Sequence, residues 1–216
     1  MPASTPPKTS PSGPGARVSR RAADRLRSGH LWVYASDIEQ IEAGSGEPPT
    51  LLPVADNRGI LLGTALYSPS SQIALRLIAR EAIDERAWSK LLETRLHSAV
   101  ARRRSMLDAE TDACRLCFSE ADELPGLIVD KYGSLVIAQF LVKGLNTPSV
   151  RDTCVRVLRD SLTPETILER PDPRMRELEG LAAPDLDALW SAHPDAPVTS
   201  TQFHLNGLVF HYDANA

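Results

Sequence analysis

Residues Ile60–Ala79 read ILLGTALYSPSSQIALRLIA, and this stretch sets the character of the first part of the chain. Two apolar runs, Ile60–Tyr67 and Gln72–Ala79, are separated by an SPSS sequence that interrupts extended structure. From Ile73 onward every second residue is apolar, which is the period of a strand with one buried face. We therefore predict two neighbouring β-strands joined by a turn.

Upstream of this pair the chain continues in short segments. Leu51–Ala55 is apolar and precedes the turn sequence Asp56-Asn57-Arg58-Gly59, and Leu31–Ile38 is a further extended run. Closely spaced short strands are typical of a small barrel or sandwich. Before them, Arg20–Gly29 has small and apolar residues at helical spacing and ends in glycine. We predict a short helix there, with its arginines on the solvent side.

The second half alternates helical and extended patterns. Asp84 can cap a helix that continues to Leu107, because apolar residues recur there at the helical period. The further elements predicted are strands at Arg115–Phe118, Gly126–Val129, Leu135–Leu141 and Glu165–Glu169, a helix at Pro148–Leu162, a loop at Ala182–Val198 and a hairpin at Phe203–Tyr212 around Asn206-Gly207.

The predicted fold class is α+β, with a small β-barrel followed by a mixed α/β domain. Residues 1–16 consist mostly of Pro, Ser, Thr and Gly and bury too little apolar surface to fold, so we predict a disordered tail. The barrel then spans residues 17–80. The α/β domain spans residues 81–212 and begins with a linker helix, and residues 213–216 would lead into a further domain.

Composition places the chain among ordinary globular proteins, with 42% hydrophobic and 24% charged residues. No apolar run approaches the roughly 20 residues that span a bilayer, and the first residues lack the apolar core of a secretory signal. Three cysteines are too few for a disulfide scaffold. These features predict a cytoplasmic protein without membrane partners.

Charge is distributed unevenly along the chain. The net charge is −4, yet residues 1–35 hold six basic side chains and one acidic side chain. Such a local basic stretch in an otherwise acidic protein can meet phosphate groups. A solvated charged surface with no ligand explains the same pattern, and charge alone does not separate the two interpretations.

Motifs for catalysis or metal binding are weak. Cys114 and Cys117 form a single C-x-x-C without a second pair, so we interpret them as structural cysteines. His204 and His211 flank the last hairpin and could face one another, which is a common packing arrangement. No glycine-rich nucleotide loop is present in the sequence. We therefore predict no catalytic, metal-binding or cofactor-binding residues in this chain.

The basic and aromatic segment from Arg17 to Tyr34 is the best candidate for a binding site. Arginines supply phosphate contacts, and exposed aromatic rings can stack on unpaired bases. We expect Trp32 to be buried, so that the arginines make the contact on a surface held by the aromatic residues. The candidate RNA-binding residues are Arg17, Arg20, Arg21, Arg25, Arg27, His30 and Tyr34, with Arg76 as a weaker candidate.

Several stretches, taken in order, resemble one enzyme family. They are RLRSGHLWVY at 25–34, GTALYSPSSQIALR at 63–76, CRLCFSEADELPGLIVDKYG at 114–133, ERPD at 169–172 and RELEG at 176–180. Together they resemble the bacterial class I SAM-dependent 23S ribosomal RNA cytosine-5 methyltransferases that carry an N-terminal PUA domain. The sequence departs from the family pattern at Cys114, where an aromatic residue is usual, and at Ser119 and Glu123, which replace glycines.

The resemblance implies that residues 17–80 are a PUA-like RNA-binding domain. In the family, a Rossmann-like domain after the last hairpin binds S-adenosyl-L-methionine (SAM) and supplies a catalytic cysteine. The chain lacks those motifs, so we expect that domain to be absent. On this reading the chain is the RNA-binding portion of a 23S rRNA methyltransferase, inactive alone and binding no SAM itself, and a homodimer is left open.

Two alternatives stay open at this point. The chain could be a stand-alone PUA-type RNA-binding module without methyltransferase activity. It could also be an α/β protein with a purely structural role and no RNA contact.

Overall fold

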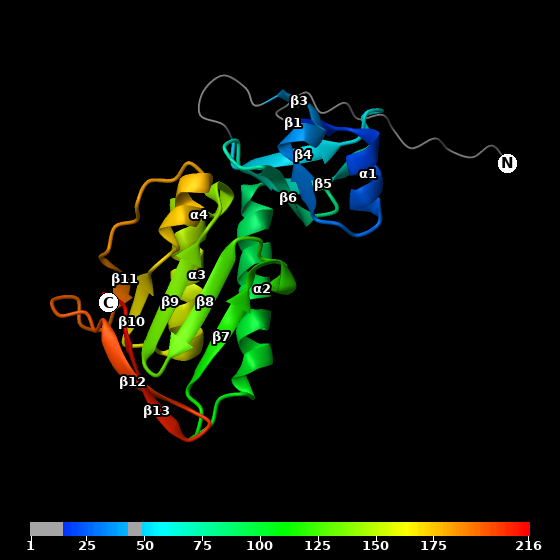
Figure 1. Cartoon of the computed structure of the whole chain (residues 1–216). Coiled ribbons are helices and arrows are strands. Elements are labelled where there is room, and N and C mark those ends of the chain that lie inside the picture. Colours follow the sequence, from blue (N-terminus) through cyan, green and yellow to red (C-terminus); the bar gives the residue numbers. More distant parts are fainter. Residues whose placement is uncertain (1–14, 43–48) are drawn as a thin grey trace. The chain divides into compact units, whose positions relative to one another are not determined.

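The computed structural model describes residues 15–42 and 49–216. The chain divides into two compact units, Met1–Glu85 and Arg86–Ala216, and each is described by itself (Figure 1). Residues 43–48, in a stretch rich in Gly and Pro, and most of the predicted N-terminal tail lie outside the described residues. Gly15 and Ala16, which we placed in that tail, instead form the start of the first strand.

The first unit is built on a six-stranded sheet with the order β2-β6-β5-β4-β1-β3. Only β1 and β4 run parallel, and the other neighbours are antiparallel. The strands are β1 (Gly15–Val18), β2 (Trp32–Tyr34), β3 (Ile38–Glu42), β4 (Leu51–Ala55), β5 (Leu61–Tyr67) and β6 (Ile73–Ala79). The quoted stretch Ile60–Ala79 thus forms the central antiparallel pair β5–β6, as predicted.

Helix α1 (Arg20–Arg27) packs on this sheet through one apolar side. Leu26 is fully buried and joins Val33, Leu52 and Leu75 in the core of the unit. Gly63 lies where β5 and β6 come closest, with a φ of +146°. A Cβ atom at this position would lie 2.0 Å from the carbonyl oxygen of Ala79, so the close approach requires glycine.

The described strand pairings leave β2 and β3 as the two edges of the sheet, whereas we predicted a small β-barrel. The reason lies in the short 3-10 helix Ala35–Asp37, which turns the chain between these two strands. The backbone N–H of Ser19 bonds to the carbonyl of Asp37 at 2.9 Å, so β3 is drawn to β1 and not to β2.

The second unit contains a five-stranded sheet with the order β11-β10-β9-β8-β7. Its strands β9 and β10 are parallel, and the other neighbours are antiparallel. The bounds are β7 (Ala113–Phe118), β8 (Leu127–Tyr132), β9 (Leu135–Phe140), β10 (Thr166–Glu169) and β11 (Ala188–Ser191). The mixed α/β pattern predicted for this region is therefore present.

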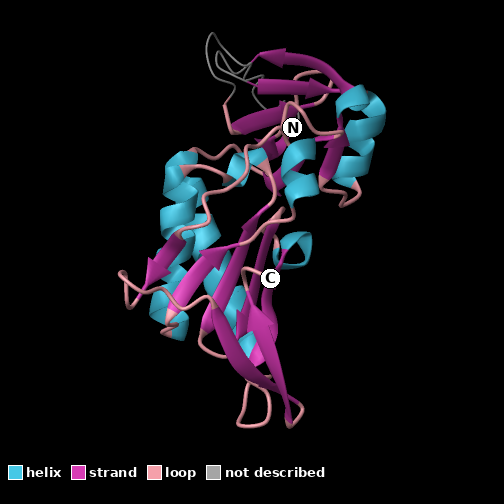
Figure 2. Ribbon diagram, turned by 60° about the vertical axis from the view of Figure 1, so that its left-hand side comes forward, coloured by secondary structure: helices cyan, strands magenta, loops and turns pink. Residues whose placement is uncertain are grey.

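Two long helices cover this sheet (Figure 2). They are α2 (Glu85–Arg104) and α3 (Pro148–Leu162), and α3 is the crossover between the parallel strands β9 and β10. The helices lie side by side, because Arg156 on α3 makes two bonds of 2.9 and 3.0 Å to the carboxylate of Glu93 on α2. Thr147 caps α3, and Pro148 occupies its first turn as predicted.

A separate two-stranded hairpin, β12 (Ser200–Leu205) and β13 (Leu208–Asp213), ends the described chain. Its turn is Asn206-Gly207, as the sequence predicts. The Tyr212 ring stacks on Tyr132 of β8 with 4.2 Å between the ring centres, which fixes the hairpin against the sheet. His204 faces Val209 and His211 faces Gln202, so the two histidines are not opposite each other as we had expected.

Two elements of the second unit were missed from the sequence. Strand β11 lies inside the predicted loop Ala182–Val198 and pairs with β10 at the sheet edge. Helix α4 (Pro173–Leu178) is capped by Asp172, whose carboxylate accepts the N–H of Arg174 at 2.8 Å. Both are short, and β11 is only half-buried, so neither shows a clear hydrophobic period.

Candidate nucleic-acid interface

Helix α1 presents the candidate arginines on a surface determined by its own amphipathic pattern. Ser19 caps the helix, and its side-chain oxygen accepts the N–H of Ala22 at 3.2 Å. Because Ala22, Ala23 and Leu26 form the buried side of the helix, its arginines point outward. Gly29, with a φ of +106°, then ends the helix.

Three of the candidate arginines are open to solvent. Arg20 is 87% exposed and approaches Asp24, one turn along the helix, at 3.9 Å. Arg17 and Arg21 are exposed, and within residues 15–42 and 49–216 neither has a side-chain hydrogen bond or ion pair. Arg17 and Arg21 can therefore meet phosphate without first giving up a partner among the described residues.

A shallow, solvent-open hollow lies on this side of α1. It is lined by Arg20, Arg21, Asp24, Arg25 and Ser28. Three guanidinium groups against one carboxylate make it a site with local positive charge. The charge is local, because the described part of the first unit has as many acidic residues as arginines.

Arg25 is held in place by two partners. Its guanidinium forms an ion pair with Asp37 and lies over the Tyr34 ring, 5.7 Å from the ring centre. His30 is exposed nearby in sequence, and its backbone N–H donates to the carbonyl of Arg25. The structure thus brings Arg25 and Tyr34 together as one cation–π unit.

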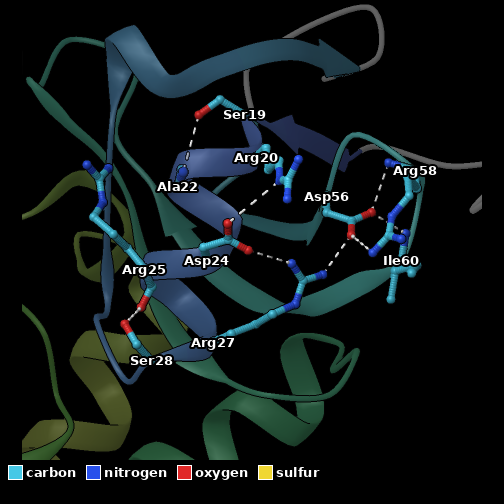
Figure 3. A network of polar contacts seen from close by, with 10 residues as sticks. All are labelled: Ser19, Arg20, Ala22, Asp24, Arg25, Arg27, Ser28, Asp56, Arg58 and Ile60. Carbon is cyan, nitrogen blue, oxygen red and sulfur yellow. Dashed lines mark hydrogen bonds and ion pairs between the residues drawn. The ribbon is translucent and has the colours of Figure 1, made fainter.

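Arg27 leaves α1 on the opposite side from Arg25 and is anchored to Asp56 (Figure 3). Its Nη2 donates to Asp56 Oδ2 at 2.6 Å, and Arg58 reaches the same oxygen at 3.5 Å. Burial opposes ionisation of Asp56, but bonds from the Ile60 N–H, the Arg27 guanidinium and the Arg58 N–H outweigh it and lower the pKa of that carboxyl.

Arg76 is not part of this surface, and its selection as an RNA contact is not supported by its position. It is buried in β6 with 6% exposure. Its Nη1 donates to the carbonyl of Ile73 at 2.9 Å and lies 3.4 Å from the Ser68 oxygen. The alternating pattern of this strand did not reveal that both of its faces are buried.

Three residues at this surface were missed or misplaced. Arg58 and Arg80 were not candidates, yet Arg58 shares Asp56 with Arg27, and Arg80 Nη1 donates to the carbonyl of Leu26 at 2.6 Å. Trp32, which we expected to be buried, is 40% exposed. The only sequence signal for the exposure of Trp32 was that it alternates with Val33 and Tyr34 in a short strand, one face of which had to point outward.

The candidate motifs of the second unit form no metal site within the described residues. Burial raises the pKa of Cys117 to about 12, and it also raises that of Cys114, so neither thiol is an activated nucleophile. This agrees with the interpretation of both as structural cysteines. In the described parts of the chain no helix is long and apolar enough to cross a membrane.

The acidic motif residues of the second unit are likewise engaged in structure. The carboxylate of Asp122 pairs with both Arg102 and Arg103 of α2. Glu169, at the end of β10, is fully buried between Arg151 and Arg176. Both carboxylates are therefore engaged in charge-assisted hydrogen bonds within the second unit.

Comparison with known proteins defines the class of the first unit. Residues 16–80 match the PUA-like domain family. The chain is 32% identical over 176 residues to "Ribosomal RNA large subunit methyltransferase I" of Pseudoalteromonas translucida, a match that covers 80% of this chain and 43% of the relative. It is 34% identical over 129 residues to "Ribosomal RNA large subunit methyltransferase" of Deinococcus radiodurans, covering 56% of this chain and 30% of the relative.

Solved structures show the same relationship at the level of fold. The chain superposes on "A putative sam-dependent methyltransferase from Streptococcus mutans" with a TM-score of 0.68, 17% identity and coverage of 90% of this chain and 47% of that one. A methyltransferase complexed with SAH gives the same TM-score at 18% identity, with coverage of 90% of this chain and 46% of that one. The chain spans less than half the length of these relatives and solved chains.

The first unit is therefore a PUA-like domain. Over 80% of its length the chain is similar to a ribosomal RNA large subunit methyltransferase, and it shares its fold with the two solved chains.

One expectation about fold class is corrected by these findings. We predicted a fold from which the Rossmann-like SAM domain is absent, yet nine-tenths of the chain superposes on methyltransferases. That expectation was drawn from the lack of the family motifs that follow the last hairpin. A short motif reports on one loop, whereas the fold is set by the packing of whole sheets and helices.

Proposed function

We propose that this chain acts in methylation of large-subunit ribosomal RNA, and that its PUA-like domain binds the RNA through the arginines of β1 and α1. The single observation that carries the RNA contact is that exposed Arg20 and Arg21 line the hollow on α1, and Arg17 on the preceding strand β1 is exposed as well. Arg25 and Arg27 complete the surface, each oriented by a buried or half-buried carboxylate.

The names of the relatives support the large-subunit rRNA as substrate and SAM as the methyl donor of the whole enzyme. The finer parts of the proposal are 23S rRNA as the substrate, cytosine C5 as the methylated position and the cytoplasm as the location. The domain's part is to place the RNA. Correct placement of a target base can lower a reaction barrier by several kcal/mol, on the order of 7–11 in well-oriented systems.

Salt-dependent binding tests the RNA contact. Affinity for a labelled 23S rRNA fragment should fall as salt rises, because phosphate contacts release counterions. Charge reversal in an Arg20→Glu and Arg21→Glu double variant should weaken binding and flatten the salt slope by about one to two. A matched control is Arg174→Glu in α4, an exposed arginine of the second unit near a helix N-terminus, where glutamate is tolerated.

Equal affinity of the double variant and the control would contradict this RNA surface. The methyl-transfer part is tested separately, by transfer of labelled methyl groups from SAM to unmodified 23S rRNA and mapping of the product. A methyl group at a position other than cytosine C5 would remove that part of the proposal.

A further inference from the structure

Strand β2 displays two aromatic rings on the outside of the first unit. Trp32 is 40% and Tyr34 is 41% exposed, while Val33 between them is 1% exposed and belongs to the core. Alternate residues of a strand point to opposite faces, so Trp32 and Tyr34 share the outer face. Because β2 pairs only with β6 among the described strands, these rings lie at an edge of the sheet.

The exposed Tyr34 ring of β2 lies next to the positively charged hollow on α1. Arg25 lies over the Tyr34 ring and also lines the hollow with Arg20 and Arg21. One surface therefore offers π-faces and guanidinium groups side by side, with Arg25 shared between them. Exposed apolar side chains rimmed by polar groups can mark a ligand-binding surface.

We infer that Trp32 and Tyr34 form a stacking platform for unpaired bases of RNA, with the phosphates held in the arginine hollow. This inference rests on the proposed function and narrows its substrate to RNA with unpaired nucleotides. Bases within a duplex are already stacked on one another, so only splayed-out bases can reach the two rings. Alternate residues of a strand are roughly 6.6 Å apart along the backbone, which leaves room for each ring to take a separate base.

The neighbouring charge favours a nucleic acid over a protein partner. An apolar protein surface would gain from the rings but would leave the arginine cluster facing it without compensation. A single-stranded nucleic acid matches both the rings and the arginines, because its bases can stack on aromatic rings while its phosphates contact the positive groove.

Fluorescence anisotropy with two probes tests the platform. The probes are a labelled oligouridylate and the same strand annealed to oligoadenylate, both offered to the whole chain at low salt. We expect tighter binding of the single strand. Trp32→Ala and Tyr34→Ala should each weaken single-strand binding about 5- to 100-fold and change duplex binding by less than about twofold. Trp32→Phe and Tyr34→Phe keep a ring at each position and should retain most of the affinity.

Tryptophan fluorescence gives a second measurement that tolerates an unstable alanine variant. A base stacked on Trp32 should quench its emission, so the oligouridylate should quench the parent chain more than Trp32→Phe. Equal quenching, or alanine variants with parental single-strand affinity, would overturn the platform. If Arg21→Glu still weakens binding in that case, the proposed RNA contact survives. If neither probe binds the parent chain but the 23S rRNA fragment does, the platform falls and the proposed RNA contact survives; if the fragment does not bind either, both proposals fall.

Discussion

The guanidinium group of Arg25 lies 5.7 Å from the centre of the Tyr34 ring, and the same group pairs with Asp37. These contacts join a helix and a strand edge that are separate in sequence. They also fix the orientation of Arg25, so that it loses less conformational entropy when it meets a phosphate. This arrangement makes Asp37 a positioning residue for the proposed RNA surface.

Replacing Asp37 with asparagine should therefore lower stability and disturb the surface. Asp37 is 14% and Arg25 24% exposed at the side chain, so the pair is partly shielded from water. We expect Asp37→Asn to lower the free energy of unfolding by about 1 kcal/mol, measured by urea denaturation. Glu39→Gln is the control on the same segment and should change it by less than about 0.5 kcal/mol. Equal unfolding midpoints for the two variants would contradict the pairing.

Stability of the first unit should depend on pH through Asp56. The pKa of this carboxyl is lowered in the folded protein, so the folded state binds its proton less readily than the unfolded chain does. Its stabilisation is therefore complete above the unfolded pKa, about 3.9, and is lost as the pH falls through the folded value. The stability gap between the parent and Asp56→Asn should shrink between about pH 5 and pH 2. A difference in stability between the two proteins that stays constant over that pH range would show that Asp56 does not cause the pH dependence.

The glycine at position 63 should tolerate no side chain. Its added Cβ would lie 2.0 Å from the Ala79 carbonyl oxygen, a backbone atom that cannot move aside cheaply. We expect Gly63→Ala to cost about 3 kcal/mol or more. Gly59→Ala is the matched control, because Gly59 has a φ of +81° but no atom within 4 Å of its Cβ position. It should cost only the backbone strain, about 1–2 kcal/mol, and thermal unfolding of both variants measures the difference.

Two residues that depart from the family sequence pattern have a left-handed backbone conformation. Ser119 has a φ of 48° and Glu123 a φ of 58°, at positions where glycine is expected from the family resemblance. Glu123→Gly should raise the free energy of unfolding by about 0.5 kcal/mol, because relief of strain exceeds the loss of its exposed pair with Arg95. Ser119→Gly should be nearly neutral, because the relief of backbone strain is offset by loss of the bond in which the Ser119 oxygen accepts the Gly126 N–H at 2.8 Å. A loss of stability in Glu123→Gly would contradict the strain argument.

Much of the fold was predictable where a local signal was strong. Helix α1, strand β6, helix α3 and the Asn206-Gly207 hairpin were all predicted from period, caps or turn chemistry. Strand β11 and helix α4 were not, because each is too short to show a period. The open edge at β2 was also missed, since strand pairing depends on contacts between distant segments.

The candidate site was predictable only in part. The arginines of α1 were found because they lie outside an apolar helical stripe. Arg76, the weaker candidate, lies instead in a strand that is buried on both faces and is itself 6% exposed. Arg58 and Arg80 were missed, because only the folded chain brings the β4–β5 turn and the end of β6 to helix α1.

The sequence by itself determined which residues would form α1 and the β5–β6 pair, because hydrophobic period and capping act within a few residues of the chain. Tertiary structure alone decided which cations stay open to solvent, which pair with carboxylates, that Trp32 and Tyr34 are exposed, and that Arg25 lies over the Tyr34 ring. The physical reason is that burial and ion pairing depend on what packs against a side chain, and that neighbour is generally far away in the sequence.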